Sequence, residues 1–577
     1  MSIRNYTNAP NTKRTPQSEP IPGREKDMSK NNAGGYSFKL DKWARLNRFL
    51  VLGSEGGSYY VSSKKLVKEN AQSVLDCLSE DGVRVVDTVV AISDSGRAPK
   101  NTPAIYVLAL AAKMGDEATA RAAYQALPRV VRTGTHLFEW VEAIKALGSV
   151  SSGAQRAITR WYTDRPVHSL ALQAVKYQSR GGWSHRDVLR LTKPSGFYPT
   201  GHEKATPEKA PYGDVFQWIT KGKAPVSTDN GTALIDAFEQ AKAIGSEGDV
   251  SKDRTRRIVS LIETHRLPRE CIPTKYLNEV AVWEALLDNG GHGMPMTAMI
   301  RNLPKMTSIG LFKGKGGNKR LAAVTSRLKS EDALRHARTH PLQVLVAMRT
   351  YGSGHGIRGS LTWNPISQIV DALDGAFYKS FQAVQPTGKR WLLALDVSGS
   401  MGAGIAGMPG INCREAAAAM AMVTAATEED THIVGFTSSG PNPFTTGDRT
   451  WSGQTGIAGL DLSPRRRLDD NVRSISNLPF GGTDCALPMV YALKRKIETD
   501  VFVVYTDSET WFSGSRHPVQ ALREYRNKMG IDAKLIVVGM SSNGFSIADP
   551  KDSGMLDVVG FDTAAPNIMS EFVKGNI

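Results

Sequence analysis

WLLALDVSGS, residues 391–400, predicts a buried strand that ends in a run of polar side chains. Three similar apolar runs follow along the chain: HIVGF at 432–436, VFVVYTD at 501–507 and AKLIVVG at 533–539. Runs of this kind are typical of strands buried on both faces of a parallel sheet. Helix-favouring stretches lie between them, at 414–429 and 518–530. We therefore expect residues 386–577 to form a doubly wound α/β domain, which binds ligands at the carboxyl ends of its strands.

Hydroxyl and carboxyl side chains follow these predicted strands and converge on one edge of the sheet. The candidate ligands of a metal ion are Asp396, Ser398, Ser400, Thr483 and Asp507. An all-oxygen set suits a hard cation, Mg²⁺ in the first place and Mn²⁺ as the alternative. Capping of the following helices is the plainer explanation for each residue alone. Together the five resemble the metal-ion-dependent adhesion site of von Willebrand factor A-type domains.

The chain before this domain has a helical pattern. Between about residues 37 and 381, apolar side chains recur at helical spacing, as in Val85, Val86, Val89 and Val90. Short Gly, Pro or Asp punctuation separates the segments, which predicts an α-solenoid of stacked helix pairs. Residues 1–36 are rich in Asn, Pro, Lys and Arg and are expected to form a disordered tail.

The basic and acidic residues are distributed unevenly between the helical part of the chain and the predicted α/β domain. The whole sequence holds 72 basic and 56 acidic residues, whereas the part from Phe381 onward is slightly acidic. The basic excess therefore lies in the helical part and favours a polyanion, most simply nucleic acid, as its partner. The four cysteines have no CxxC spacing, which predicts a reducing cytoplasm rather than disulfides or zinc. No apolar run is long enough to span a membrane.

The stretch KYQSRGGWSHRDVLRL, residues 176–191, is the strongest candidate for contact with phosphate. Two glycines break the preceding helix, and Ser184 and Asp187 predict a capped start for the next one. A helix start presents free amide groups and a positive dipole end to an anion. The side chains expected to contact RNA here are Lys176, Arg180, His185, Arg186 and Arg190. A packed or capping role is the alternative for His185.

A second candidate is the glycine-rich stretch TYGSGHGIRG, residues 350–359. Tyr351, His355 and Arg358 could stack on bases and contact phosphates, as in single-strand binders. A tight structural turn between helices is an equally good interpretation. Arg465, Arg466 and Arg467, in the polar segment 451–470, could add an RNA or protein contact.

Catalytic motifs are missing from the sequence. It contains no Walker A motif, HExxH, GxSxG or CxxC. We therefore expect a binding protein and not an enzyme. The alternatives are a metal-dependent protein-interaction module and a metal-assisted phosphoesterase, which would cleave RNA in the presence of Mg²⁺.

Several stretches, in one order, resemble the Ro autoantigen or TROVE-domain family. They include RFLVLGSEGGSYY (48–60), KYQSRGGWSHRD (176–187), TYGSGHGIRG (350–359), PTGKRWLLALDVSGSM (386–401) and GGTDCALPM (481–489). The resemblance implies a ring of HEAT-like helical repeats over residues 37–381, closed by an A-type domain over 386–577. It implies a monomer that binds single-stranded ends of misfolded RNAs in a central hole and Y-like noncoding RNA on the outer surface. The exoribonuclease polynucleotide phosphorylase is an implied partner in RNA quality control.

Overall fold

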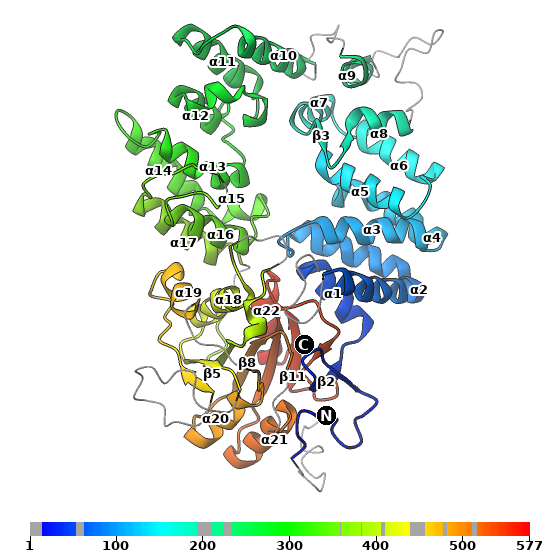
Figure 1. Cartoon of the computed structure of the whole chain (residues 1–577), viewed down its shortest axis with the longest axis vertical. Helices are drawn as coiled ribbons and strands as arrows, with labels where there is room; N and C mark the ends of the chain where they lie inside the picture. Colours follow the sequence, from blue (N-terminus) through cyan, green and yellow to red (C-terminus); the bar gives the residue numbers. More distant parts are fainter. Residues whose placement is uncertain are drawn as a thin grey trace.

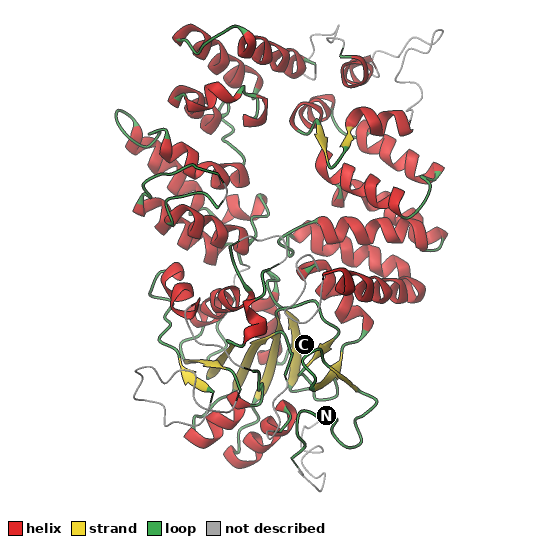
Figure 2. Ribbon diagram, viewed as in Figure 1, coloured by secondary structure: helices red, strands yellow, loops and turns green. Residues whose placement is uncertain are grey.

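The computed structural model describes residues 14–53, 63–192, 210–222, 232–357, 359–381, 384–405, 410–438, 456–476, 482–510 and 516–577. The protein combines an all-helical part with a C-terminal α/β domain, which we call the A-type domain (Figures 1 and 2). This division confirms the predicted fold class. No helix in these ranges is both long enough and apolar enough to cross a membrane.

The helical part leaves the A-type domain on one side and returns to it on the other (Figure 1). Helices that are close to one another in sequence also pack together, as α2 does with α1, α3 and α4. Such packing lets each short amphipathic helix bury its apolar face against its neighbours. The helices of this part are α1 Lys42–Leu52, α2 Ser63–Ser95, α3 Thr102–Met114, α4 Glu117–Val130, α5 Gly134–Ala146, α6 Ser152–Thr163, α7 Val167–Lys176, α8 His185–Thr192, α9 Ala210–Lys221, α10 Ala233–Ser246, α11 Lys252–His265, α12 Val280–Asp288, α13 Met296–Ser308, α14 Gly317–Leu328, α15 Glu331–His336, α16 Pro341–Gly352 and α17 Ser367–Lys379.

The two ends of the helical part meet each other at the A-type domain. Arg97, between α2 and α3, donates from Nε to Asp562 Oδ1 of the A-type domain at 2.9 Å. His340, just before α16, bridges the carbonyl oxygens of Phe561, at 2.8 Å, and Arg97, at 3.2 Å. These contacts join both ends of the helical array to one corner of the A-type domain, so the array is closed into a ring.

The A-type domain is built on a six-stranded sheet of order β11-β9-β8-β5-β6-β7, parallel except for β7. Every residue of β5 and β8 is buried, as the apolar runs predict. Alternate residues enter two cores: Leu393 joins the core shared with the ring, whereas Leu392 joins the core beneath α20 and α21. The elements are β5 Trp391–Asp396, α18 Cys413–Thr427, β6 Thr431–Phe436, β7 Ile457–Gly459, α19 Leu468–Ser476, α20 Leu487–Arg495, β8 Val501–Thr506, α21 Pro518–Met529, β9 Lys534–Gly539, β10 Phe545–Ser546, β11 Met555–Val559 and α22 Ala565–Lys574.

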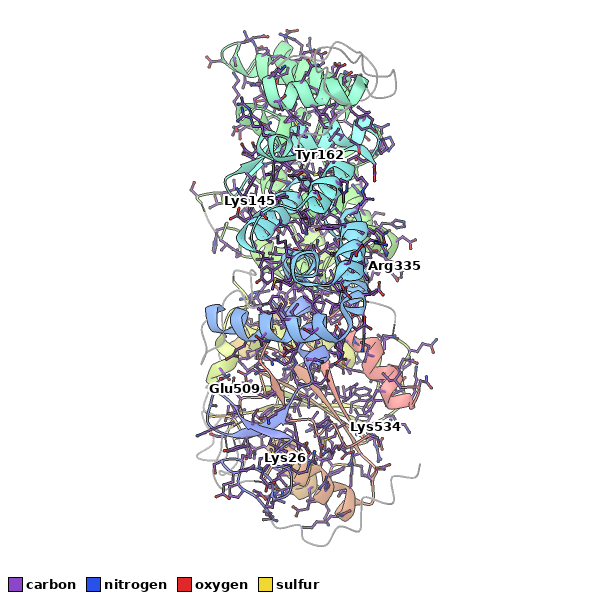
Figure 3. The ribbon with its side chains drawn as sticks, turned by 90° about the vertical axis from the view of Figure 1, so that its right-hand side faces the viewer. Lys26, Lys145, Tyr162, Arg335, Glu509 and Lys534 are labelled. Carbon is purple, nitrogen blue, oxygen red and sulfur yellow. The ribbon has the colours of Figure 1, made fainter. Side chains whose placement is uncertain are left out.

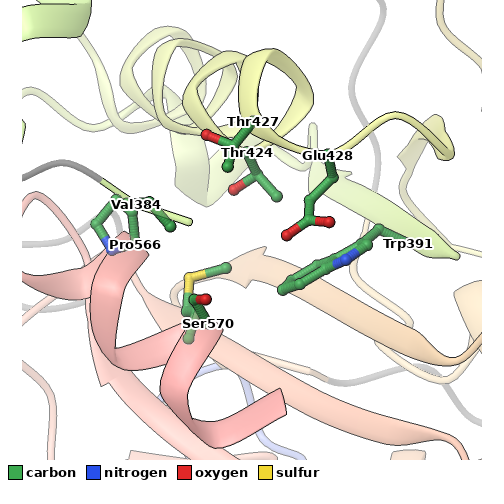
Figure 4. Close-up of a pocket in the computed structure, with 8 residues that line it drawn as sticks. Val384, Trp391, Thr424, Thr427, Glu428, Pro566 and Ser570 are labelled. Carbon is green, nitrogen blue, oxygen red and sulfur yellow. The ribbon is translucent and has the colours of Figure 1, made fainter. Parts of the chain in front are cut away.

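The connection from ring to sheet is fixed just before β5. The backbone amides of Thr387 and Gly388 donate to the Glu428 carboxylate, at 2.9 and 3.2 Å, and the Trp391 indole donates to Thr387 Oγ1 at 3.1 Å. Figure 4 shows Glu428 and Trp391 facing Ser570 of α22 across a small pocket. The hydrogen bonds fix the point at which the chain enters the sheet, whose far edge carries the candidate metal ligands.

Residues 14–39 form part of the A-type domain. Strand β1, Met28–Lys30, pairs with β2, Tyr36–Lys39, and β2 pairs with β10, all antiparallel. Met28 and Phe38 enter the core beneath α20 and α21. The prediction of a disordered tail over 1–36 is therefore wrong for residues 14–36; residues 1–13 lie outside the described ranges. The average composition of this segment concealed a few apolar side chains that pack on a distant part of the chain.

Candidate metal centre and nucleic-acid surface

Four of the five predicted metal ligands end or follow β5 or β8 at the carboxyl edge of the sheet, and Thr483 lies in the loop before α20. Asp396 is the last residue of β5, Asp507 directly follows β8, and the other ligands lie in the loops beside them. The structure buries all five side chains, each at most 3% exposed: Asp396, Ser398, Ser400, Thr483 and Asp507. Ser398 Oγ lies 3.0 Å from Ser400 Oγ. Among the described residues no three His, Cys, Asp or Glu side chains form a metal site, so a cation here would depend on the hydroxyl groups.

Each carboxylate of the centre accepts hydrogen bonds from its own edge of the sheet. Asp396 Oδ1 accepts from the Ser398 amide at 2.9 Å, and Asp396 Oδ2 accepts from the Thr506 hydroxyl at 2.6 Å. Asp507 Oδ1 accepts from the Glu509 amide at 3.1 Å. These bonds orient both carboxylates. Because the donors are uncharged, they do not neutralise the negative charge of an ionised carboxylate. Thr506 was not predicted, although it occupies the position just before Asp507.

Electrostatics at this edge favour a bound cation. Burial raises the pKa of Asp396 and of Asp507. The nearby charges of Asp396 and Glu509 raise the pKa of Asp507 in addition. Arg414 offsets part of this, because its guanidinium lowers the pKa of Asp396. Two buried carboxylates with hydroxyl oxygens around them form a donor set that fits Mg²⁺ or Mn²⁺.

The stretch 176–191 folds as predicted around its two glycines. Helix α7 ends at Lys176, a short hairpin follows, and α8 begins at His185. Strands β3, Ser179–Arg180, and β4, Trp183–Ser184, pair across the two glycines, whose φ angles of 58° and 82° favour glycine. The predicted cap is present: Asp187 accepts from the Ser184 amide at 3.0 Å, and the Asp187 amide donates to Ser184 Oγ at 3.3 Å.

Four of the predicted basic side chains reach the solvent here. Arg180, Arg186 and Arg190 are exposed and Lys176 is half-buried. In the part of the chain that the structure describes, none of the four forms an ion pair with an acidic group. We call Lys176, Arg180, Arg186 and Arg190 the cationic face. Because these four cations have no ion-pair partner within the described residues, their charge is left for a ligand from solution.

An aromatic side chain that the sequence did not single out lies beside the cationic face. Trp183, in β4, is half-buried, and Lys145 Nζ sits 4.8 Å from the centroid of its ring. Figure 3 shows Lys145, which belongs to α5. The Trp183 indole also contacts Glu142. A cation stacked on an aromatic ring next to unpaired arginines adds to the positive potential of this surface.

His185 is not on the surface, which corrects the prediction that it contacts phosphate. It is 2% exposed, its Nδ1 lies 2.9 Å from the Tyr162 hydroxyl, and its ring packs against Phe138 and Trp161. Helical periodicity explains this: His185 shares the inner side of α8 with Val188 and Leu189, whereas the two arginines of the helix are exposed. The packed role, which the sequence left open, is the one the structure supports.

In the glycine-rich stretch 350–359, the structure supports only part of the predicted RNA contact. Tyr351 is buried, its hydroxyl lies 2.8 Å from Thr307 Oγ1, and its ring stacks on Trp363, so base stacking by Tyr351 is ruled out in this conformation. His355 is exposed. Arg358 lies outside the described residues. In the segment 451–470, Arg466 pairs with Asp461 and Arg467 with Asp371 and Asp469, whereas Arg465 is exposed.

Burial of His185 predicts a loss of stability in mild acid. Desolvation lowers the pKa of His185 to about 4, from about 6.5 in an unfolded chain. The unfolded state therefore binds the proton first, and stability present above pH 6.5 is lost as the pH falls towards 4. At pH 5 this amounts to about 2 kcal/mol from His185. We expect His185→Gln to reduce the drop in unfolding free energy between pH 7.5 and 5 by that amount, measured in urea.

The exposed His355 supplies the control for this measurement. His355→Gln removes an exposed imidazole and so controls for the loss of a histidine as such. Equal pH dependence in His185→Gln and the wild type would contradict the assignment of a neutral, buried His185.

Comparisons with known proteins cover nearly the whole chain. A family model described as the TROVE domain matches residues 29–229 and 264–351, and one described as the Ro60 vWA domain matches residues 390–573. The chain is 37% identical to the RNA-binding protein RO60 of Caenorhabditis elegans over 609 aligned residues, covering 95% of this chain and 90% of the relative. It is also 37% identical to the RNA-binding protein RO60 of Deinococcus radiodurans, over all of both chains. The crystal structure of the D. radiodurans Ro (RSR) protein matches with a TM-score of 0.63 and 35% identity, covering 93% of this chain and 100% of that one.

Proposed function

Because the chain belongs to the Ro60 family of TROVE-domain proteins, we propose that it is an RNA-binding scaffold and not an enzyme. Structured RNA, of the Y-like noncoding kind, contacts the cationic face on the outside of the ring. Single-stranded ends of misfolded RNAs enter the ring itself. The two relatives compared above are both named RNA-binding proteins, which supports the general activity.

The observation that carries this proposal is the unpaired charge of the cationic face. Many exposed cations of this protein are held by acids, as Arg121 is by Glu117 and Lys528 by Glu524. A cation already paired with an acid gains little from a phosphate, because the ion pair must first be broken. The cationic face carries no such cost and lies around the start of α8.

Tailed and blunt RNAs distinguish the proposal from its alternatives. We expect a stem with a single-stranded 3′ tail to bind more tightly than a blunt duplex of equal length, measured by fluorescence anisotropy over a series of salt concentrations. Binding should weaken steeply with salt and be insensitive to EDTA, and the labelled RNA should stay intact in Mg²⁺. Cleavage that requires Mg²⁺ would favour a phosphoesterase, and no binding at low salt would remove the proposal.

We further propose that the A-type domain holds one divalent cation, Mg²⁺ or Mn²⁺. Asp396, Ser398, Ser400, Thr483 and Asp507 would hold it. Bound there, the ion would supply positive charge between two buried carboxylates and so stabilise the loops that carry them. The depth of these side chains disfavours the alternative in which the ion grips the acidic group of a partner protein.

The remaining parts of the proposal rest on family membership and composition. A partner exoribonuclease, such as polynucleotide phosphorylase, would degrade the RNAs that the ring retains. A ring that one chain closes by itself supports a monomer. The cysteines, all buried thiols, are compatible with a reducing cytoplasm as the site of action.

A further inference from the structure

The loop after β8, residues 507–510, is held by the N-terminal segment. Asn32 Nδ2 and the Ala33 amide donate to the two oxygens of the Glu509 carboxylate, at 2.8 and 3.0 Å. Asn31 Nδ2 donates to the Thr510 carbonyl at 2.7 Å. Figure 3 shows Glu509 close to the ribbon of this segment. Because Asp507 opens the same loop, the N-terminal segment fixes a candidate metal ligand from outside the six-stranded sheet.

The first ring helix holds the same loop through a buried arginine. Arg48 of α1 is 1% exposed and extends into the A-type domain. Its Nη1 donates to Asn543 Oδ1 at 2.8 Å, and its Nη2 donates to Asp557 Oδ1 at 2.6 Å. Asn543 Nδ2 in turn donates to the Asp507 carbonyl. A chain of two hydrogen bonds therefore runs from the ring to the residue that carries the metal-facing carboxylate.

The Arg48 guanidinium fits against β9 because residue 539 is a glycine. A Cβ atom on Gly539, the last residue of β9, would lie 2.5 Å from Arg48 Nη2. Any larger residue at Gly539 would displace the guanidinium. Strand β9 and helix α1 are therefore closely packed at this contact, which leaves the Arg48 guanidinium little room to move.

The loop itself adopts a conformation that needs such support. Ser508 has a φ of 60°, in the left-handed region that residues with a side chain rarely adopt. Its hydroxyl is buried and has no hydrogen-bond partner within the described residues. Backbone strain of this kind persists only where contacts with the surrounding residues hold the strained conformation in place. The N-terminal segment and Asn543 provide those surroundings.

We propose that Arg48 is a positioning residue for the cation site. Through Asn543 it holds the loop 507–510 in the metal-binding conformation, so this one contact between the ring and the A-type domain sets the affinity for the cation. The inference rests on the proposed cation site. By linkage, a bound cation strengthens the docking of ring and A-type domain by the same factor.

Arg48→Met tests this in the full-length protein, with Arg97→Met as the matched control. Both variants remove an arginine that joins the ring to an aspartate of the A-type domain, but the Arg97 pair, with Asp562, touches no residue of the loop 507–510. The probe is Mn²⁺, measured by isothermal titration calorimetry. We expect Arg48→Met to weaken Mn²⁺ binding about 10-fold or more, as loss of an outer-shell partner does, and Arg97→Met to change it less than about twofold.

A second, smaller pair of variants serves if Arg48→Met does not fold. Asn543→Ala breaks the same relay and leaves the ion pair of Arg48 with Asp557 intact. Its control is Asn70→Ala, since Asn70 Nδ2 donates to the Ser542 carbonyl at 3.1 Å, one residue away, without touching the loop 507–510. We expect faster amide hydrogen exchange in 507–510 for Asn543→Ala only, together with weaker Mn²⁺ binding.

The outcomes separate this inference from the cation proposal on which it rests. If the wild type binds Mn²⁺ and Asn543→Ala binds it equally well, the positioning role is overturned and the cation site stands. Equal weakening by Arg48→Met and Arg97→Met would also overturn it, because general loosening of the interface would then be the cause. If the wild type binds no Mn²⁺, both proposals fall.

Discussion

Replacing the four cations of the cationic face with glutamine is expected to weaken binding of a structured RNA by roughly 100- to 1000-fold at about 0.1 M salt. Each of the four, Lys176, Arg180, Arg186 and Arg190, lacks an acidic partner among the described residues, so each is available to a phosphate. About 1 kcal/mol for each lost contact gives a loss of this order. Titration of a labelled, tailed RNA by fluorescence anisotropy measures it.

A second quadruple variant controls for net charge. Arg335, Arg473, Lys528 and Lys551 are each at least 60% exposed and paired with an acid. Their replacement with glutamine lowers the net charge equally but should weaken RNA binding less than about fivefold, through long-range electrostatics alone. A similar loss in both quadruple variants would mean that RNA responds to total charge and that the cationic face is no site. Both variants should keep the wild-type circular dichroism spectrum, because the replaced side chains reach the solvent.

The second large effect concerns the cation. Asp507→Ala should abolish Mn²⁺ binding, because it removes one of only two carboxylates proposed as ligands. At about 100 times the dissociation constant, Mn²⁺ should stabilise the wild type by about 2.7 kcal/mol and leave the variant unchanged. Without the ion the variant should be no less stable, since burial and the nearby charges of Asp396 and Glu509 already oppose ionisation of Asp507 and raise its pKa. Calorimetry and thermal unfolding, each with and without Mn²⁺, measure the two effects.

Asp562→Asn is the matched control for the cation. Asp562 is also a buried carboxylate near the carboxyl edge of the sheet, but Arg97 neutralises it. The variant should bind Mn²⁺ as the wild type does. Unchanged Mn²⁺ binding by Asp507→Ala would refute the proposed ligand set.

The sequence predicts that Asp396 and Asp507 lie at the same edge of the sheet, because the rule behind this prediction is topological. Asp396 and Asp507 each end an apolar run, and adjacent parallel strands bring such ends together. The supporting partners could not be predicted in this way. Arg48 and Asn543 are almost five hundred residues apart in the sequence, and no local sequence pattern predicts their contact.

Residue type misleads where the direction of the side chain is left out. His185 lies among basic residues in the sequence, but its spacing from Val188 and Leu189 places it on the apolar side of α8. Tyr351 is likewise the buried end of α16 rather than part of an open loop. In the N-terminal segment the local composition was polar, whereas its pairing with β10 depends on residues at the other end of the chain.

The most direct test of RNA binding by the cationic face is the salt dependence of affinity for one tailed RNA. The logarithm of the association constant should fall linearly with the logarithm of salt concentration, and the slope should be smaller by about 3 to 4 in the variant lacking Lys176, Arg180, Arg186 and Arg190. That difference would show that the four side chains neutralise phosphates. The same slope in the variant and the wild type would contradict the account, because RNA would then be bound elsewhere on the protein.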